Sequence, residues 1–159
     1  MEDKIKEKKT FSSDMKNLYP MLIWVKERVI KYFNQKDLEN IELSCEEIFI
    51  NIIKHGYLYK KGSIHIDLTL NAVLEITFTD KAKKFNPFDQ KEKIYKKLSK
   101  KEREVGGLGI FLVFECMDEV IYKRESSCNI LTIIKKRSLN YWFFSIAVKV
   151  ASVSNISNR

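Results

Sequence analysis

The first third of the chain places hydrophobic residues at helical spacing. Apolar side chains recur every three to four residues over Leu18–Phe33, which predicts an amphipathic helix there. Pro20 is compatible with this helix because it falls in the first turn. A second helix is predicted to follow, with Asp37 as its N-cap. It should end at Gly56, since glycine readily takes the left-handed conformation that ends many helices.

Further along, hydrophobic and polar residues alternate, which indicates strands. The alternation runs through Ser63–Leu70 and, after a turn near Asn71, through Leu74–Phe78. These two segments are therefore predicted to form a hairpin with one buried face. Three more strands are expected, at Val120–Tyr122, at Ile130–Ile134 and within Ile5–Phe11.

A basic stretch and a glycine turn separate the two strand pairs. Residues 81–105 are polar and Lys-rich without a clear period, which is typical of a functional loop or lid. The alternative is a short solvated helix around Glu92–Lys101. The turn Gly106–Gly109 leads into a short helix that should end before Asp118. This order predicts an α+β fold, a two-layer α/β sandwich with a mixed, mostly antiparallel sheet and helices on one face.

Chain length and cysteine content indicate one cytoplasmic domain with a short tail. The chain has 159 residues, and its three cysteines lack the paired spacing of a zinc site or a disulfide framework. The domain is predicted to span residues 1–137, and residues 138–159 form the tail. The apolar part of the tail, Tyr141–Val153, is shorter than the roughly 20 residues that cross a bilayer. Packing on the domain or self-association is expected there rather than membrane contact.

The net charge of +8 is concentrated in two segments. Residues 91–103 and residues 135–159 each carry a net charge of +5, which leaves −2 for the rest of the chain. The body of the domain is thus not basic. An anionic ligand or an acidic protein partner fits this distribution at least as well as a duplex, and no direct nucleic-acid contact is expected.

Two segments carry candidate chemistry. Glu47, Asn51 and His55 are four residues apart and fall on one helix face, as a solvated stripe or as part of a site. The turn Gly106–Gly109 offers unobstructed backbone N–H groups at a helix start, which suits phosphate. It matches neither the Walker pattern nor a dinucleotide fingerprint. A different nucleotide-binding fold is required.

Four motifs in one order answer that requirement. They are Glu47-x-x-x-Asn51 with His55-Gly56-Tyr57, Asp80 with Phe85-Asn86-Pro87, the run Gly106–Val113, and Met117-Asp118-Glu119-Val120. Together they resemble the N-box and glycine boxes of the GHKL (Bergerat) ATP-binding superfamily, most closely its branch of bacterial anti-sigma-factor serine/threonine kinases. The resemblance covers about Phe11 to Lys136.

The resemblance implies a role for each matched position. Asn51 would coordinate Mg²⁺ on the ATP phosphates, because an oxygen donor suits this hard cation. Glu47 would be the general base for a protein hydroxyl, and Asp80 would accept a hydrogen bond from the adenine amino group. The remaining ATP-binding positions would be Gly107, Leu108 and Gly109, with the 91–105 segment closing as a lid.

Four positions depart from the family pattern or carry less weight. Ala82 stands in place of a glycine, and Cys128-Asn129 in place of the Gly-Thr of many relatives. Either nucleotide affinity is reduced, or Ala82 is a tolerated substitution. His55 is expected to pack beside Tyr57 or to cap the helix end.

Two functions follow from the resemblance. The first is an ATP-dependent serine/threonine protein kinase that acts as an anti-sigma factor in a bacterial partner-switching module. Its partners would be a sigma factor and a small anti-anti-sigma antagonist, which it phosphorylates, and it would be a homodimer. The second is a non-catalytic anti-sigma or adaptor module with weakened nucleotide binding. A sensor histidine kinase is disfavoured, because there is no room for its dimerising helical pair.

Overall fold

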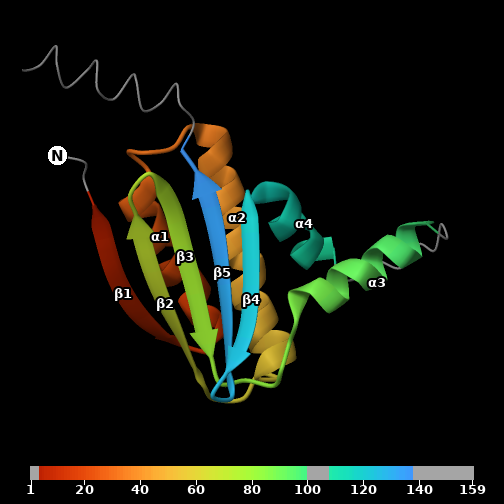
Figure 1. The fold of residues 1–159 in the computed structure, drawn as a ribbon. Helices are drawn as coiled ribbons and strands as arrows, with labels where there is room; N and C mark the ends of the chain where they lie inside the picture. Colours follow the sequence, from red (N-terminus) through yellow and green to blue (C-terminus); the bar gives the residue numbers. More distant parts are fainter. Residues whose placement is uncertain (1–3, 100–107, 138–159) are drawn as a thin grey trace, which may run out of the picture.

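The computed structural model describes residues 4–99 and 108–137, which form one sheet with helices. The strands are β1 (Ile5–Ser12), β2 (Ser63–Leu70), β3 (Val73–Asp80), β4 (Glu119–Glu125) and β5 (Cys128–Lys136). They lie in the order β1-β2-β3-β5-β4, and each of the four pairings is antiparallel (Figure 1). The predicted hairpin, the second strand pair and the expected first strand are thus confirmed.

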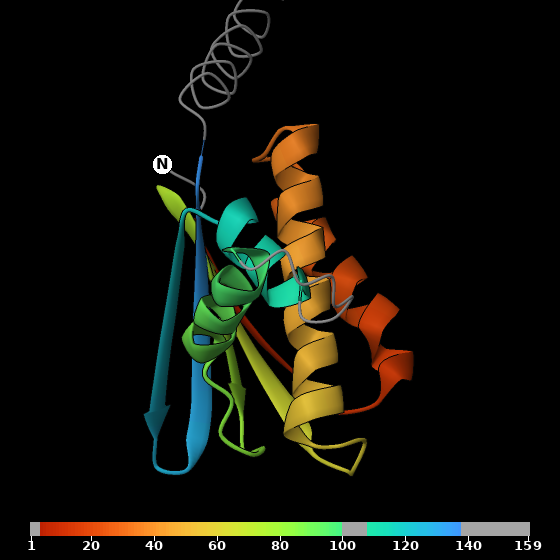
Figure 2. The same cartoon turned by 90° about the vertical axis from the view of Figure 1, so that its right-hand side faces the viewer.

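The helices are α1 (Leu18–Val29), α2 (Gln35–Asn51), α3 (Pro87–Ser99) and α4 (Leu108–Cys116). The first two and α4 lie on the same side of the sheet (Figure 2). The core forms between them, where alternate residues of β2 and β3 meet the apolar face of α2. The predicted two-layer α+β sandwich is confirmed.

The start of α2 differs from the prediction. Asn34 is its N-cap, with extended backbone, and its Oδ1 accepts a hydrogen bond of 2.8 Å from the backbone N–H of Asp37. Asp37 lies in the first turn instead, where the positive end of the helix dipole stabilises a carboxylate. The assignment of Asp37 as the N-cap was therefore wrong by three residues.

The end of this helix is a change of winding. After Asn51 the chain continues as a π-helical turn, Ile52–Gly56, closed by a hydrogen bond of 2.8 Å from the N–H of Tyr57 to the carbonyl of Ile52. The predicted end at Gly56 is confirmed, but the predicted left-handed backbone is not there. It occurs at Leu58 and Tyr59, with φ of 53° and 60°.

Gly56 is required for a different reason. A Cβ at this position would lie 2.8 Å from the Cβ of Ala82, closer than two carbon atoms can approach. The helix end and the loop after β3 are therefore packed directly against each other.

The basic stretch contains a helix rather than an irregular loop. Helix α3 begins at Pro87, five residues before the alternative range Glu92–Lys101 that the sequence also allowed. Asn86 initiates it, since its Oδ1 accepts from the N–H of Phe88 at 3.1 Å, and proline suits the first helical position. Helix α3 projects from the sandwich beside α4 (Figure 1). The ring centroids of Phe88 on α3 and Phe114 on α4 are 5.0 Å apart.

The predicted tail, 138–159, lies outside the described residues, as does the first half of the glycine turn. Within the described ranges, none of the helices has the length and apolar character needed to cross a membrane.

Candidate functional site

Asp80 is the most buried acidic side chain of the candidate site. It ends β3 at the same end of the sandwich as the C-terminus of α2 (Figure 1), and only 3% of its surface is exposed. Its Oδ1 accepts two hydrogen bonds of 2.8 Å, from the backbone N–H of Ala82 and from Nδ2 of Asn129. Among the described residues, Oδ2 accepts none. Burial raises the pKa of Asp80, although both hydrogen bonds and the charge of Arg124 act in the opposite direction.

A small cavity opens beside this carboxylate. Apolar side chains of Ile52, Phe85 and Leu131 line it together with Asp80 and Asn129. Its volume is about 20 Å³, enough for about one water. A buried carboxylate oxygen with no protein donor fits the amino group of a purine, whereas a whole base requires the surrounding side chains to move apart.

Glu47 lies against the beginning of α4. A Cβ on Gly109 would overlap the Glu47 carboxylate and come within 2.5 Å of its Cδ. A side chain at position 109 would therefore displace the Glu47 carboxylate from its place against α4. Burial raises the pKa of Glu47, the neighbouring Glu46 charge adds to this, and Lys54 opposes it.

Asn51 is the last residue of α2, one turn beyond Glu47. Its side chain is half-buried and forms no hydrogen bond with the described residues. An amide oxygen in this position is available to a ligand. Among the residues that the structure describes, no three His, Cys, Asp or Glu side chains cluster as a metal site.

His55 is exposed and belongs to the π-helical turn. Its ring stacks on Phe85, with centroids 6.3 Å apart and planes 12° from parallel. Packing beside Tyr57 or capping of the helix end was expected for His55. The structure shows Phe85 as its ring partner, because the π-helical turn directs His55 to the loop after β3.

The glycine turn is only partly described. Gly107 lies outside the described residues, Leu108 begins α4 with 48% of its surface exposed, and Gly109 follows it. The phosphate-binding role assigned to these three positions stays a prediction.

Sequence reasoning missed a polar network around Asn129. On β4, Tyr122 and Arg124 both donate to Oδ1 of Asn129, from Oη at 2.9 Å and from Nη1 at 2.6 Å. Alternation along β4 places residues 122 and 124 on the same face, which was the available signal. Their common target, however, depends on the register between β4 and β5.

Comparison with known proteins identifies similar sequences and a similar fold. Two curated relatives, both named serine-protein kinase RsbW, come from the Staphylococcus aureus strains bovine RF122 / ET3-1 and MRSA252. Each is 33% identical over 102 residues, which cover 59% of this chain and 63% of the relative. The chain thus spans less than two thirds of the length of these relatives.

A solved structure has the same fold. It contains the RsbU and RsbW domains of Rv1364c from Mycobacterium tuberculosis, with a TM-score of 0.59 and 13% identity over 84% of this chain and 32% of that one. The family described as histidine kinase-like ATPase domain matches residues 11–135. With this match over most of its length, the chain belongs to the histidine kinase-like ATPase domain family, the GHKL fold that its motifs resemble.

Proposed function

We propose that this protein is an ATP-dependent serine/threonine protein kinase that acts as an anti-sigma factor. The observation that carries the proposal is the placement of Glu47, whose carboxylate lies against Gly109 with a raised pKa. It lies one helical turn from Asn51, whose side chain forms no hydrogen bond with the residues that the structure describes. The name serine-protein kinase, which both curated relatives carry, supports the same activity.

Each residue has one task in this proposal. Asp80 would bind the adenine amino group through Oδ2, and Asn51 would contribute an oxygen to Mg²⁺, which would offset the negative charge of the phosphates. Bound ATP supplies the phosphoryl group. Glu47 accepts the proton of the attacking protein hydroxyl, and its raised pKa makes it a stronger base than an exposed carboxylate. Gly107, Leu108 and Gly109 hold the phosphates.

The partners belong to the proposal as well. They are a sigma factor, which the protein sequesters, and a small anti-anti-sigma protein, which it phosphorylates on serine or threonine. We expect a cytoplasmic homodimer of the 1–137 domain that makes no direct contact with nucleic acid.

One observation favours a second function, a non-catalytic binding module. The cavity beside Asp80 measures only about 20 Å³, and Ala82 is packed against the helix end at Gly56. If this cavity cannot widen, the domain would bind its protein partners but would not bind a nucleotide. The two functions differ in a quantity that calorimetry measures directly.

Titration of the full chain with Mg-ATP, together with the Asn51→Ala variant, separates them. The wild type should bind, and Asn51→Ala should weaken binding at least about tenfold, which corresponds to about 1.4 kcal/mol. Asn40→Ala makes the same change on the same helix, three turns earlier, and should leave the affinity unchanged. No heat and no thermal stabilisation of the wild type at millimolar Mg-ATP would favour the binding module.

A further inference from the structure

We propose that Asn129 is the positioning and specificity-determining residue of the nucleotide site. Together with Arg124, it holds Asp80 and the loop 81–86 so that only Oδ2 of Asp80 faces an incoming base. This inference rests on the proposed binding of ATP. It extends that proposal to a residue that distinguishes adenine from guanine.

Asn129 lies directly across the sheet from Asp80. The two residues are paired in the register of β3 and β5, and both are almost fully buried, with 5% and 3% of their surfaces exposed. Nδ2 of Asn129 donates to Oδ1 of Asp80 at 2.8 Å. Because the N–H of Ala82 donates to the same oxygen, Oδ1 is already occupied by protein donors.

The orientation of the Asn129 amide is forced by its neighbours. Arg124 can only donate, and its Nη1 lies 2.6 Å from Oδ1 of Asn129. The carboxylate of Asp80 and the carbonyl of Lys83 can only accept, and both take hydrogen bonds from Nδ2, at 2.8 Å and 3.1 Å. The amide therefore cannot flip without losing these bonds, and the carboxylate of Asp80 is held with it.

The same side chain restrains the loop after β3. Besides the carbonyl of Lys83, it reaches the carbonyl of Ala82 and the backbone N–H of Phe85, each at 3.5 Å. This loop contains no glycine between Asp80 and Pro87. The Asn129 side chain thus restrains this glycine-free loop through hydrogen bonds.

Base selection follows from Oδ2 of Asp80, which accepts no hydrogen bond from the described part of the chain. An ionised carboxylate only accepts hydrogen bonds, so Oδ2 of Asp80 attracts the amino group of adenine and repels the carbonyl oxygen of guanine. A threonine at position 129 has a single hydroxyl donor and could serve either Asp80 or the loop. Discrimination should therefore depend on the whole amide.

The charge of Arg124 favours the ionised form of the Asp80 carboxyl group. Burial raises the pKa of Asp80, while the hydrogen bond from Asn129 and the charge of Arg124 lower it. Among the described residues, the titratable groups that face Asp80 are Arg124 and Tyr122, both on β4. The π-helical turn contributes only Ile52 and Gly56 to the cavity beside Asp80, and neither side chain titrates. Removing either member of the Arg124–Asn129 pair should favour the neutral acid, which can also donate a hydrogen bond and so tolerates guanine.

The test compares two quantities across matched variants of the full chain. The first is the pKa of Asp80 in nucleotide-free protein, followed by carbon-13 NMR of its carboxyl group. The second is the ratio of the Kd for Mg-GTP to that for Mg-ATP. In Asn129→Leu and in Arg124→Met, the pKa should rise and the ratio should fall at least about tenfold, which corresponds to about 1.4 kcal/mol of discrimination.

Two further variants serve as controls. Asn129→Thr keeps one donor and should fall between Asn129→Leu and the wild type. Lys123→Met removes a charge from the neighbouring position of β4, where the lysine is exposed and pairs with Glu125, and it should change neither quantity.

The outcomes keep the two proposals apart. An unchanged Asp80 pKa in both Asn129→Leu and Arg124→Met would overturn the positioning role, and an unchanged ratio would overturn the specificity role. If Asn129→Leu does not fold, Asn129→Thr decides in its place, because Arg124→Met raises the pKa of Asp80 through the loss of its charge alone. A wild type that binds neither nucleotide would overturn the proposed function, while the Asp80 titration would still decide whether Asn129 positions the carboxylate.

Discussion

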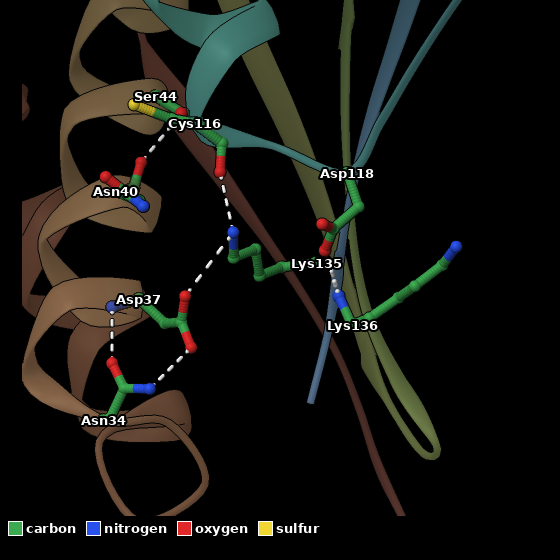
Figure 3. Close-up of polar contacts among 8 residues, drawn as sticks. All are labelled: Asn34, Asp37, Asn40, Ser44, Cys116, Asp118, Lys135 and Lys136. Atoms are coloured by element: carbon green, nitrogen blue, oxygen red, sulfur yellow. Dashed lines mark hydrogen bonds and ion pairs between the residues drawn. The ribbon is translucent and has the colours of Figure 1, made fainter. Parts of the chain in front are cut away.

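The polar side chains at the two ends of helix α2 differ in whether they have hydrogen-bond partners among the described residues. At the N-terminal end, Asp37 lies between two donors, Nδ2 of Asn34 at 2.9 Å and Nζ of Lys135 at 3.5 Å (Figure 3). Lys135 also donates to the carbonyl of Cys116 at 2.9 Å, which ties the end of α4 to the same cluster. The side chains of Lys135 and Asp37 are only 11% and 17% exposed, yet each has partners.

At the C-terminal end of the helix, Glu47 and Asn51 have no hydrogen-bond partner among the described residues. Partly buried polar groups without partners lower stability. The N-terminal end of α2 is called the satisfied end below, and under the proposed function a bound ligand would contact Glu47 and Asn51 at the other end. Substitutions at each end should therefore affect different measurements.

Glu47→Gln should have the largest effect. The amide keeps the shape of the side chain but cannot accept the proton of the attacking hydroxyl. Phosphoryl transfer to an antagonist protein should fall by about 10²–10⁴-fold, while the Kd for Mg-ATP stays near the wild-type value. Because the pKa of Glu47 is raised, the wild-type transfer rate should increase with pH until this carboxyl group is ionised. Single-turnover assays with labelled ATP measure both.

Glu46→Gln is the matched control, since it removes a neighbouring carboxylate about 100° around the helix. Transfer should stay within a few-fold of the wild type, with its pH profile displaced to lower pH because the Glu46 charge helps to raise the pKa of Glu47. A Glu47→Gln variant that transfers phosphate as fast as the wild type would remove Glu47 from the chemistry.

Lys135→Met tests the satisfied end. It leaves Asp37 with one donor fewer and the carbonyl of Cys116 without its lysine, so the free energy of unfolding should fall by about 1–3 kcal/mol. The Kd for Mg-ATP should not change, because the lysine lies at the other end of α2 from the candidate site. Urea unfolding and calorimetry measure the two quantities.

Lys136→Met is the control for that variant. Its side chain is 64% exposed and its Nζ lies 3.7 Å from Glu119, a surface pair that should contribute less than about 1 kcal/mol. Equal destabilisation by both variants would contradict a special role for Lys135. A loss of nucleotide affinity in Lys135→Met would mean that the two ends of the helix are coupled.

The fold was largely predictable because burial imposes a period on the sequence. Strands β2 and β3 alternate residue by residue, and the predicted ranges match the observed ones closely. Helix α3 was assigned as a loop with a helix only as the alternative. Its many lysines suggested a loop, whereas Phe88 and Tyr95 pack on α4, a contact between two segments that the sequence alone does not place together.

Long-range contacts limited the prediction of the site. Asn34 and Asp37 are both N-cap residue types, and the carboxylate of Asp37 is engaged by Lys135, a residue far along the chain. Glu47, Asn51 and Asp80 could be predicted through a family resemblance. The hydrogen bonds of Asn129 could not, because they require the pairing of β3, β5 and β4.

Asp80→Asn should have the smallest effect on stability and the opposite sign. The substitution preserves an oxygen that can accept from Ala82 and Asn129, and it removes a buried charge. In the wild type the folded-state pKa of Asp80 lies above the ordinary value of 3.8, so its ionisation reduces stability as pH rises through that interval. Asp80→Asn should thus unfold at a slightly higher temperature than the wild type at neutral pH, and the difference should vanish below pH 3.8, where the carboxyl group is neutral in both states. Thermal unfolding across this pH range measures it. An Asp80→Asn variant that is less stable than the wild type at neutral pH would contradict this. It would mean that the ionised carboxylate stabilises the fold through its protein partners, as Asp37 does at the satisfied end.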